Sequence, residues 1–363
     1  MVKLRPVGDW IADRFEIFAV HPGGMGVVYV AHDHKGTPGR NLLAIKTLRE
    51  EWLLDSVWAS RFAAECELWV RLGSHPNIVH ALSVERFEGK PHILLELVTG
   101  GDLRRRIGTP SLDVPRVLDL GIQFCLGMDH AVRQGLRCHR DVKPGNLMLG
   151  ADGTLKITDF GLAVLRDQLY ADPDFSINLD GDSMDKTPPW PNPRDDRTPP
   201  RISIDSTAAT LQGQTDGGAI DLDSFKIAPS GSSEPAHLRI TQTGSLLGTL
   251  PYMAPEQFRD AKAVDIRADI YAFGIVLFQL LTGKLPFHGK TIARFDRAHE
   301  RYVPPSVVPS IPRKYAREAG AIDAVVQRCL SKDADDRFAT MNDLRKALTA
   351  ILRRVDPNHR IRK

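Results

Sequence analysis

The sequence predicts an α+β protein of two lobes, a small strand-rich lobe followed by a larger helical one. The first hundred residues alternate short β-branched runs with turns, around one segment of helical spacing. Beyond them, apolar residues recur at the period of amphipathic helices over long stretches. A chain of 363 residues with 42% hydrophobic and 26% charged side chains is long enough for sizeable cores and typical of a globular protein.

The first lobe is expected to contain a β-sheet and one helix. Apolar and β-branched runs bounded by turn residues predict its strands, at residues 14–20, 26–32, 42–48 and 91–98. Between the third and fourth strands, the spacing of apolar residues predicts a helix over residues 55–73.

The second lobe is expected to be helical. Four segments show the helical spacing of apolar residues, at 113–135, 265–283, 318–330 and 340–355. The segment 265–283 is apolar on nearly all sides, which predicts a buried helix.

Residues from about 170 to 240 break the globular pattern. They contain nine prolines and thirteen Ser or Thr residues, with twelve acidic against six basic side chains. Such a composition cannot bury enough apolar surface to fold, so we expect a disordered insertion. The predicted organisation is an N-terminal segment (1–11), a strand-rich lobe (12–98), a helical lobe with the insertion (99–352) and a basic tail (353–363).

Charge and cysteine content exclude several classes of protein. The net charge of +3 gives no reason to expect binding to nucleic acid. The four cysteines have no CxxC spacing, so neither a zinc site nor a disulfide framework is indicated, and a reducing cytoplasm is expected. No signal peptide and no apolar run of membrane-spanning length is visible, so no membrane span is expected.

The glycine-rich stretch "HPGGMG", residues 21–26, joins the first two predicted strands. Gly23, Gly24 and Gly26 would let the backbone turn tightly and approach a ligand. Glycine turns between strands are also common as plain hairpins, so this motif alone is weak evidence for nucleotide binding.

Lys46 lies in the third predicted strand, in "LLAIK". A carboxylate on the following helix, such as Glu65, could pair with it. Glu67 lies on the same helix, and a plain surface role is the alternative for both glutamates.

The stretch "CHRDVKPGNLML" carries the strongest chemical signal. Asp141, Lys143 and Asn146 fall within six residues, after a long predicted helix. Asp159 follows a short predicted strand in "KITDFGLA". An acid, a cation and a carboxamide this close together indicate the handling of Mg²⁺ and phosphate.

These motifs resemble those of the eukaryotic-type protein kinases, and among them the bacterial serine/threonine kinases. In order along the chain they are the glycine loop, "AIK", "ILLELV", "HRDVKPGN", "DFG", "GTLPYMAPE", "DIRADIYAFG" and "DADDRF", within residues 15–350. The resemblance implies the bilobal kinase fold, with an antiparallel sheet in the first lobe. It also implies transfer of the γ-phosphoryl group of ATP to Ser or Thr hydroxyls of proteins, with Mg²⁺, or Mn²⁺ in its place.

The resemblance implies the catalytic roles. Asp141 would accept the proton of the substrate hydroxyl, and Lys143 would steady the transferring phosphoryl group. Lys46 would hold the α- and β-phosphates, paired with Glu65, which fits the family spacing to "HPN" better than Glu67. The metal would be held by Asn146 and Asp159.

The resemblance also implies a nucleotide site. Leu95 resembles the gatekeeper, and His21 replaces the first glycine of the family's loop. Backbone groups of Glu96 and Val98 would contact the adenine, and Asp102 would reach the ribose. The full set implied to contact the nucleotide is Gly23, Gly24, Gly26, Val28, Ala44, Lys46, Leu95, Glu96, Val98, Asp102 and Asn146.

Other positions resemble structural or specificity residues of the family. Lys143 together with Thr249 is the serine/threonine pattern. Glu256 and Arg337 resemble a buried ion pair, and Asp269 resembles a brace for the catalytic loop. His139 is expected to be a buried apolar-core residue. Gly145, with Arg104 to Arg106 nearby, disfavours a strongly basic target sequence.

The insertion falls inside the segment that the family uses as its activation loop. Thr241 and Thr243 resemble activating phosphorylation sites, and Arg140 could pair with the added phosphate. Expected partners are protein substrates, the chain itself through autophosphorylation, and a transient homodimer.

Two rival interpretations remain: a pseudokinase or scaffold, and a small-molecule phosphotransferase. A nucleotide-dependent oxidoreductase is excluded because no βαβ unit follows the glycines.

Overall fold

The computed structural model of the protein describes residues 4–23, 26–36, 41–49, 56–160, 248–259, 264–289 and 291–359. In the helix that begins at residue 56, the side chains of residues 56–61, 64 and 65 lie outside this description. The expected insertion at about 170–240, Thr241 and Thr243 also lie outside the described residues.

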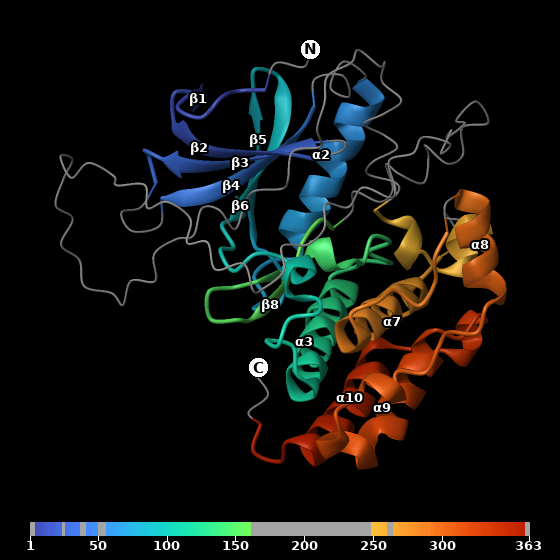
Figure 1. The fold of residues 1–363 in the computed structure, drawn as a ribbon. Coiled ribbons are helices and arrows are strands. Elements are labelled where there is room, and N and C mark those ends of the chain that lie inside the picture. Colours follow the sequence, from blue (N-terminus) through green and yellow to red (C-terminus); the bar gives the residue numbers. More distant parts are fainter. Residues whose placement is uncertain are drawn as a thin grey trace, which may run out of the picture.

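The N-terminal lobe is a six-stranded sheet with one long helix against it (Figure 1). Neighbouring strands are antiparallel, in the order β1-β2-β3-β4-β6-β5. The elements are β1 (Trp10–Ile11), β2 (Phe15–Pro22), β3 (Gly26–Asp33), β4 (Leu42–Leu48), α2 (Ser56–Arg71), β5 (Ala81–Phe87) and β6 (Lys90–Glu96).

The four predicted strands of this lobe are confirmed as β2, β3, β4 and β6, and the predicted helix is confirmed as α2. Sequence reasoning missed the two-residue β1 and the longer β5. Only the first residue of β5, Ala81, is fully buried, so this strand carries little of the apolar signal that predicts strands. Pairing with β6 determines its position.

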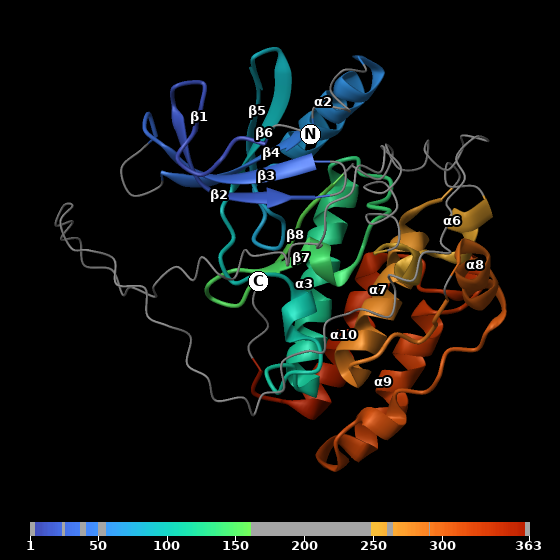
Figure 2. The same ribbon diagram turned by 45° about the horizontal axis from the view of Figure 1, so that its top comes forward.

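Helices dominate the C-terminal lobe, where α3, α7, α9 and α10 lie together (Figures 1 and 2). These four confirm the predicted helices, and together with the sheet they confirm the α+β fold class. The elements are α3 (Val114–Arg133), β7 (Leu147–Leu149), β8 (Leu155–Ile157), α6 (Pro255–Arg259), α7 (Ile266–Thr282), α8 (Ile292–Arg301), α9 (Ala316–Cys329) and α10 (Met341–Val355).

Local sequence signals account for the ends of these helices. Asp113, Asp265 and Thr340 each stand just before a helix, and each side chain accepts a backbone N–H of its first turn. Gly283 ends α7 with a φ of 75°, a left-handed conformation that glycine adopts without strain.

The helix α7 runs through the core of this lobe, and nearly all of its residues are buried. A Cβ atom on Gly274 would lie only 2.6 Å from the Cβ of Cys329 on α9, so this glycine permits the close approach of the two helices. On another side, the rings of Phe273 and Phe124 of α3 stack with centroids 3.8 Å apart. The core thus packs α7 against both α9 and α3.

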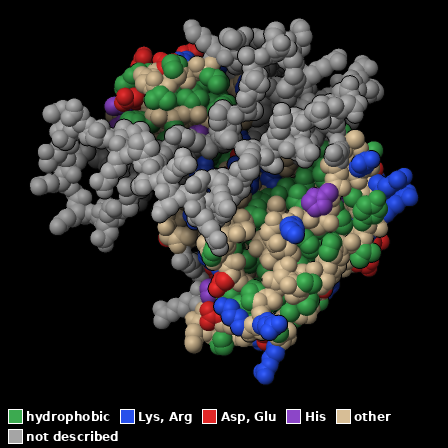
Figure 3. All heavy atoms as spheres, in the orientation of Figure 1, with side chains coloured by type: hydrophobic (Ala, Val, Ile, Leu, Met, Phe, Trp, Pro, Cys, Tyr) green, Lys and Arg blue, Asp and Glu red, His purple; other side chains and the backbone are tan. Residues whose placement is uncertain are grey.

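Lys and Arg side chains gather over α8 at the edge of the helical lobe (Figure 3). Arg294, Arg297 and Arg301 are exposed on this helix. Within the described ranges, no helix has the length and apolarity needed to cross a bilayer.

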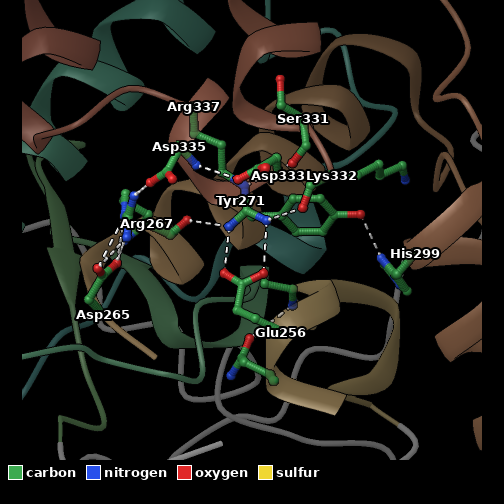
Figure 4. A network of polar contacts seen from close by, with 12 residues as sticks. Glu256, Asp265, Arg267, Tyr271, His299, Ser331, Lys332, Asp333, Asp335 and Arg337 are labelled. Atoms are coloured by element: carbon green, nitrogen blue, oxygen red, sulfur yellow. Dashed lines mark hydrogen bonds and ion pairs between the residues drawn. The ribbon is translucent and has the colours of Figure 1, made fainter. Parts of the chain in front are cut away.

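A polar network joins α6 to the segment between α9 and α10 (Figure 4). Arg337, whose side chain is 0% exposed, donates to the two carboxylate oxygens of Glu256 at 2.6 and 2.8 Å. It also donates to the backbone carbonyls of Ser331, Arg267 and Lys332, at 2.9, 3.0 and 3.2 Å. The predicted Glu256–Arg337 ion pair is confirmed.

Replacement of Arg337 by Met is expected to lower the free energy of unfolding by about 3 kcal/mol, because Glu256 loses its partner and three backbone carbonyls lose the donors of the buried guanidinium. Urea unfolding followed by circular dichroism measures this change. Arg133→Met, at a side chain 72% exposed, is the control and should change stability by less than about 0.5 kcal/mol. A loss below about 1 kcal/mol for Arg337→Met would contradict the importance of the network.

The side-chain amine of Lys332 is buried beside this network. Its Nζ atom lies 4.3 Å from the ring centre of Phe287 and has no hydrogen-bond partner among the described residues. Burial, with the nearby charge of Arg337, lowers the pKa of Lys332 to about 8. The folded protein therefore resists protonation of an amine that is charged in the unfolded chain.

Between about pH 8 and the ordinary lysine pKa, the unfolded chain binds more protons at Lys332 than the folded protein does, so this group makes stability rise with pH. The variant Lys332→Met should be at least as stable as the parent at pH 7. Its stability should increase less with pH than that of the parent, because the contribution of Lys332 is absent. Thermal unfolding of both proteins from pH 7 to about pH 10 measures the difference. Parallel stability curves, or a marked loss at pH 7, would contradict the prediction.

Candidate active site

The catalytic loop follows α3 and is held from below by a buried carboxylate. Asp269 of α7 is 1% exposed and accepts the backbone N–H groups of His139 and Arg140, at 2.7 and 2.8 Å. Burial raises the pKa of Asp269, and these N–H groups oppose the shift. Arg140 has a φ of 67°, which is strained for a residue with a side chain. The predicted brace is confirmed.

His139 is a core residue, as expected. It is 0% exposed, and its ring lies 4.9 Å from that of Phe160. Its Nε2 lies 2.9 Å from the carbonyl oxygen of Thr158, which ties the catalytic loop to the segment that carries Asp159.

Asp141, 4% exposed, lies in a cluster of polar side chains. Its Oδ2 atom is 3.0 Å from Nζ of Lys143 and accepts Nδ2 of Asn146 at 2.9 Å. Its Oδ1 accepts the hydroxyl of Thr249 at 3.1 Å, and this hydroxyl also accepts Nζ of Lys143 at 3.0 Å. The structure thus brings together three residues predicted from one motif and a fourth from more than a hundred residues away.

Thr249 was singled out in the sequence only as part of a specificity pattern. Its direct contact with Asp141 was missed because residues so far apart in sequence meet only in the fold. The motif "GT", which contains Thr249, and the nearby motif "APE" were the sequence features that could have indicated this contact.

Lys46 of β4 and Asp159 meet across the two lobes. Nζ of Lys46 lies 2.7 Å from Oδ1 of Asp159. Burial alone would raise the pKa of Asp159, but the charge and hydrogen bond of Lys46 outweigh it and lower the pKa. The carboxylate is therefore ionised at neutral pH. The side chain of Glu65 lies outside the described residues, so its pairing with Lys46 stays a prediction.

Four of the residues predicted to line the nucleotide site share one face of the sheet. Val28 pairs in register with Lys46, and Ala44 pairs with Leu95. Directly opposite residues of neighbouring strands point to the same side, and so do alternate residues of one strand. The four side chains therefore lie on the face that Lys46 shares with Asp159, while nucleotide binding itself stays a prediction.

The glycine loop lies between β2 and β3, and the structure describes its residues 21–23 and 26. The N–H of Gly23 donates to the carbonyl of Gly26 at 2.8 Å. A Cβ on Gly26 would lie 2.6 Å from the carbonyl oxygen of Thr47, so only glycine fits there. His21 pairs in register with Val28, and burial, with the charge of Arg105, lowers its pKa. Gly24 lies outside the described residues.

The segment after β6 joins the two lobes. The side chain of Glu96 accepts hydrogen bonds from Nζ of Lys156 at 2.7 Å and from the backbone N–H of His80 at 2.8 Å. The backbone N–H of Glu96 donates to the carbonyl of His80 at 2.9 Å, so the predicted contact of the Glu96 backbone with adenine would fall to its carbonyl. Val98 is 4% exposed at the end of this segment. Gly100 donates its N–H to the carbonyl of Leu149 on β7 at 2.9 Å.

Asp102, predicted to reach the ribose, forms a two-bond ion pair with Arg104. Nε of Arg104 donates to Oδ1 of Asp102 at 3.0 Å, and Nη2 of Arg104 donates to Oδ2 at 2.7 Å. A Cβ on Gly145 would lie 3.2 Å from Nε of the same arginine. A basic side chain thus lies against the turn that carries Asn146.

The donor set fits a divalent metal that is shared with phosphate. Asp159 offers an ionised carboxylate and Asn146 a carboxamide oxygen, both hard ligands that Mg²⁺ accepts. No group of three or more His, Cys, Asp or Glu side chains in the described ranges could hold a metal by itself. Mg²⁺ is typically held by one or two carboxylates together with substrate phosphates, and the residues present fit that arrangement.

Comparison with known proteins adds independent evidence. The pattern of the protein kinase domain matches residues 20–175 and 220–348. The probable serine/threonine-protein kinase PknB of Lactococcus lactis is 28% identical over 343 residues, which cover 93% of this chain and 42% of that protein.

Two further relatives match in the same way. The serine/threonine-protein kinase Pkn1 of Myxococcus xanthus is 29% identical over 337 residues, 91% of this chain and 37% of that protein. The serine/threonine-protein kinase PknB of Mycolicibacterium smegmatis is 27% identical over 352 residues, 94% of this chain and 43% of that protein. The chain spans about two fifths of the length of these curated relatives. The family pattern covers most of the chain and the fold is bilobal, so the chain belongs to the protein kinase domain family.

Proposed function

We propose that the chain is an ATP-dependent serine/threonine protein kinase, which transfers the γ-phosphoryl group of ATP to Ser or Thr hydroxyls of proteins. The observation that carries this proposal is the carboxylate of Asp141, held by the side chains of Lys143, Asn146 and Thr249. The names of the relatives, which are serine/threonine-protein kinases, support the same class of acceptor.

In this proposal Asp141 accepts the proton of the substrate hydroxyl. The hydroxyl oxygen forms a bond to the γ-phosphorus while the bond from that phosphorus to the bridging oxygen breaks, and ADP leaves. The proton passes to the Asp141 carboxylate. The bonds from Asn146 and Thr249 keep this carboxylate in one orientation, so its acceptor oxygen is positioned before the substrate arrives.

The two lysines place positive charge along the phosphate chain. Lys143, 3.0 Å from the Asp141 carboxylate, would steady the transferring phosphoryl group, and Lys46 would hold the α- and β-phosphates. Asn146 and Asp159 would hold a divalent ion, Mg²⁺ in our proposal. That ion, when bound, neutralises charge that develops on the phosphate oxygens.

Asp141→Asn is expected to reduce phosphate transfer at least about a hundredfold, because the amide cannot accept the hydroxyl proton. Transfer is measured by incubating purified protein with labelled ATP and Mg²⁺, followed by phosphosite mapping. Asp129→Asn, on the surface of α3, is the matched control and should keep the activity of the parent.

If the parent transfers no more label than Asp141→Asn, the chain is a pseudokinase or scaffold and the proposal fails. If, in the same incubation with small hydroxyl compounds added, label reaches one of these and no protein hydroxyl, the small-molecule alternative is favoured.

We also propose that the segment from about residue 170 to 240 is an insertion in the activation loop, within a helical lobe at residues 99–352. The match to the family pattern is interrupted between residues 175 and 220, which supports an additional segment there. Because the free energy of loop closure rises only with the logarithm of length, such an insertion is compatible with the fold.

The double variant Thr241→Ala/Thr243→Ala should have lower activity, because phosphate at these sites would pair with Arg140 and order the loop. A charge-assisted hydrogen bond of about 1.5–3 kcal/mol corresponds to about tenfold or more in the population of the ordered loop. The rate of substrate phosphorylation and the phosphate in the loop are measured together, with phosphatase-treated parent as the control. A double variant with the rate and loop phosphate of the parent would refute the proposal.

A further inference from the structure

The side chain of Gln257, in α6, connects two backbones of the active site. Its Oε1 accepts the N–H of Ala254 at 2.9 Å, and its Nε2 donates to the carbonyl of Arg140 at 3.2 Å. The residue is 8% exposed. The side chain of Gln257 thus connects the catalytic loop to the segment that follows Thr249. Thr249 itself contacts Asp141.

The carbonyl that Gln257 binds belongs to the peptide group between Arg140 and Asp141. Peptide groups are planar, so a bond to the carbonyl also orients the N–H on the same plane. That N–H, of Asp141, lies 3.3 Å from Nδ1 of His139 on the opposite edge. The plane that leads into Asp141 is therefore held at both edges.

Arg140 makes this support necessary. Its φ of 67° costs about 1–3 kcal/mol for a residue with a side chain, so the surrounding bonds must hold it there. Asp269 binds the N–H of Arg140, and Gln257 binds the carbonyl of the same residue. A relaxation of φ would rotate the following peptide and displace the Asp141 carboxylate.

The amide of Gln257 suits both partners, because it offers an acceptor and a donor at once. The N–H of Ala254 requires an acceptor and the carbonyl of Arg140 requires a donor. A carboxylate would satisfy Ala254 but place a negative oxygen against the carbonyl unless it is protonated. An aliphatic side chain would satisfy neither group.

We propose that Gln257 is a positioning residue of the phosphotransfer reaction, which orients Asp141 through the Arg140–Asp141 peptide and couples it to the segment that begins at Thr249. This inference rests on the proposed kinase function. Gln257 does not touch the reacting atoms; it acts through the backbone that carries Asp141.

The test compares Gln257→Leu, which removes both bonds, with Gln257→Glu, which keeps the acceptor for Ala254 and regains a donor only when protonated. Gln327→Leu is the matched control, since the amide of Gln327 on α9 also donates to a backbone carbonyl, that of Pro305 at 3.0 Å. The carboxyl of Gln257→Glu would be buried against the carbonyl of Arg140, which should raise its pKa above the ordinary glutamate value of about 4.3. Steady-state kinetics with ATP and a protein substrate are therefore measured from about pH 8 to about pH 5, with thermal unfolding of each variant.

Gln257→Leu should lower kcat about tenfold to a hundredfold, with KM for ATP changed by less than about twofold, because the nucleotide contacts are unaffected. Gln257→Glu should lose activity at high pH and recover it relative to the parent as the pH falls and its carboxyl becomes protonated. Gln327→Leu should follow the parent at every pH.

The proposal is overturned if Gln257→Leu keeps kcat within about twofold of the parent. It is also overturned if the Leu and Glu variants lose activity equally at every pH and in proportion to a lower unfolding temperature, as a merely structural role predicts.

Amide hydrogen exchange separates this inference from the proposed function. The Ala254 amide should exchange faster in Gln257→Leu and stay protected in Gln257→Glu. If the parent transfers no phosphate, the proposed function fails, and exchange then tests only whether Gln257 holds the backbone of Ala254. Faster exchange of the Ala254 amide in the Leu variant would support that bond, and unchanged exchange would overturn it.

Discussion

The rest of the site depends on one constraint. The carboxylate of Asp269 accepts two hydrogen bonds from backbone N–H groups of the loop that carries Asp141. Burying a carboxylate at 1% exposure inside an apolar helix is costly unless it is hydrogen-bonded. Here the N–H groups of His139 and Arg140 provide those bonds. The cost of the buried charge and the strain at Arg140 are thus offset by the same contact, which fixes where the catalytic loop begins.

From this anchor the active site extends by short hydrogen bonds within one lobe. His139 ties the loop to the segment of Asp159, and Asn146 and Thr249 hold the carboxylate of Asp141. The last of these bonds links parts of the chain more than a hundred residues apart. The Glu256–Arg337 pair fixes the chain shortly after Thr249, on the C-terminal side of the residues that lie outside the description.

The sequence predicted most of this site because its chemistry is local. Asp141, Lys143 and Asn146 lie within six residues, and their types and spacing alone indicate phosphate chemistry. The contacts of Thr249 and Gln257 could not be predicted, because they depend on which distant segments meet. The strand β5 and the helix α8 were missed for another reason: β5 is mostly half-exposed and α8 is rich in arginine, so neither shows a strong apolar pattern.

The two lobes contribute to the site in different ways. The C-terminal lobe holds the carboxylate of Asp141, the proposed proton acceptor, by several mutually supporting bonds, whereas the ion pair of Lys46 with Asp159 reaches across from the sheet. An ion pair at the end of a long side chain constrains position less than a bonded backbone does. Substitutions in the glycine loop, for example at His21, should therefore change the affinity for the nucleotide. Changes beneath the loop of Asp141 should act on the chemical step of the proposed reaction, because they move the carboxylate that is proposed to receive the proton.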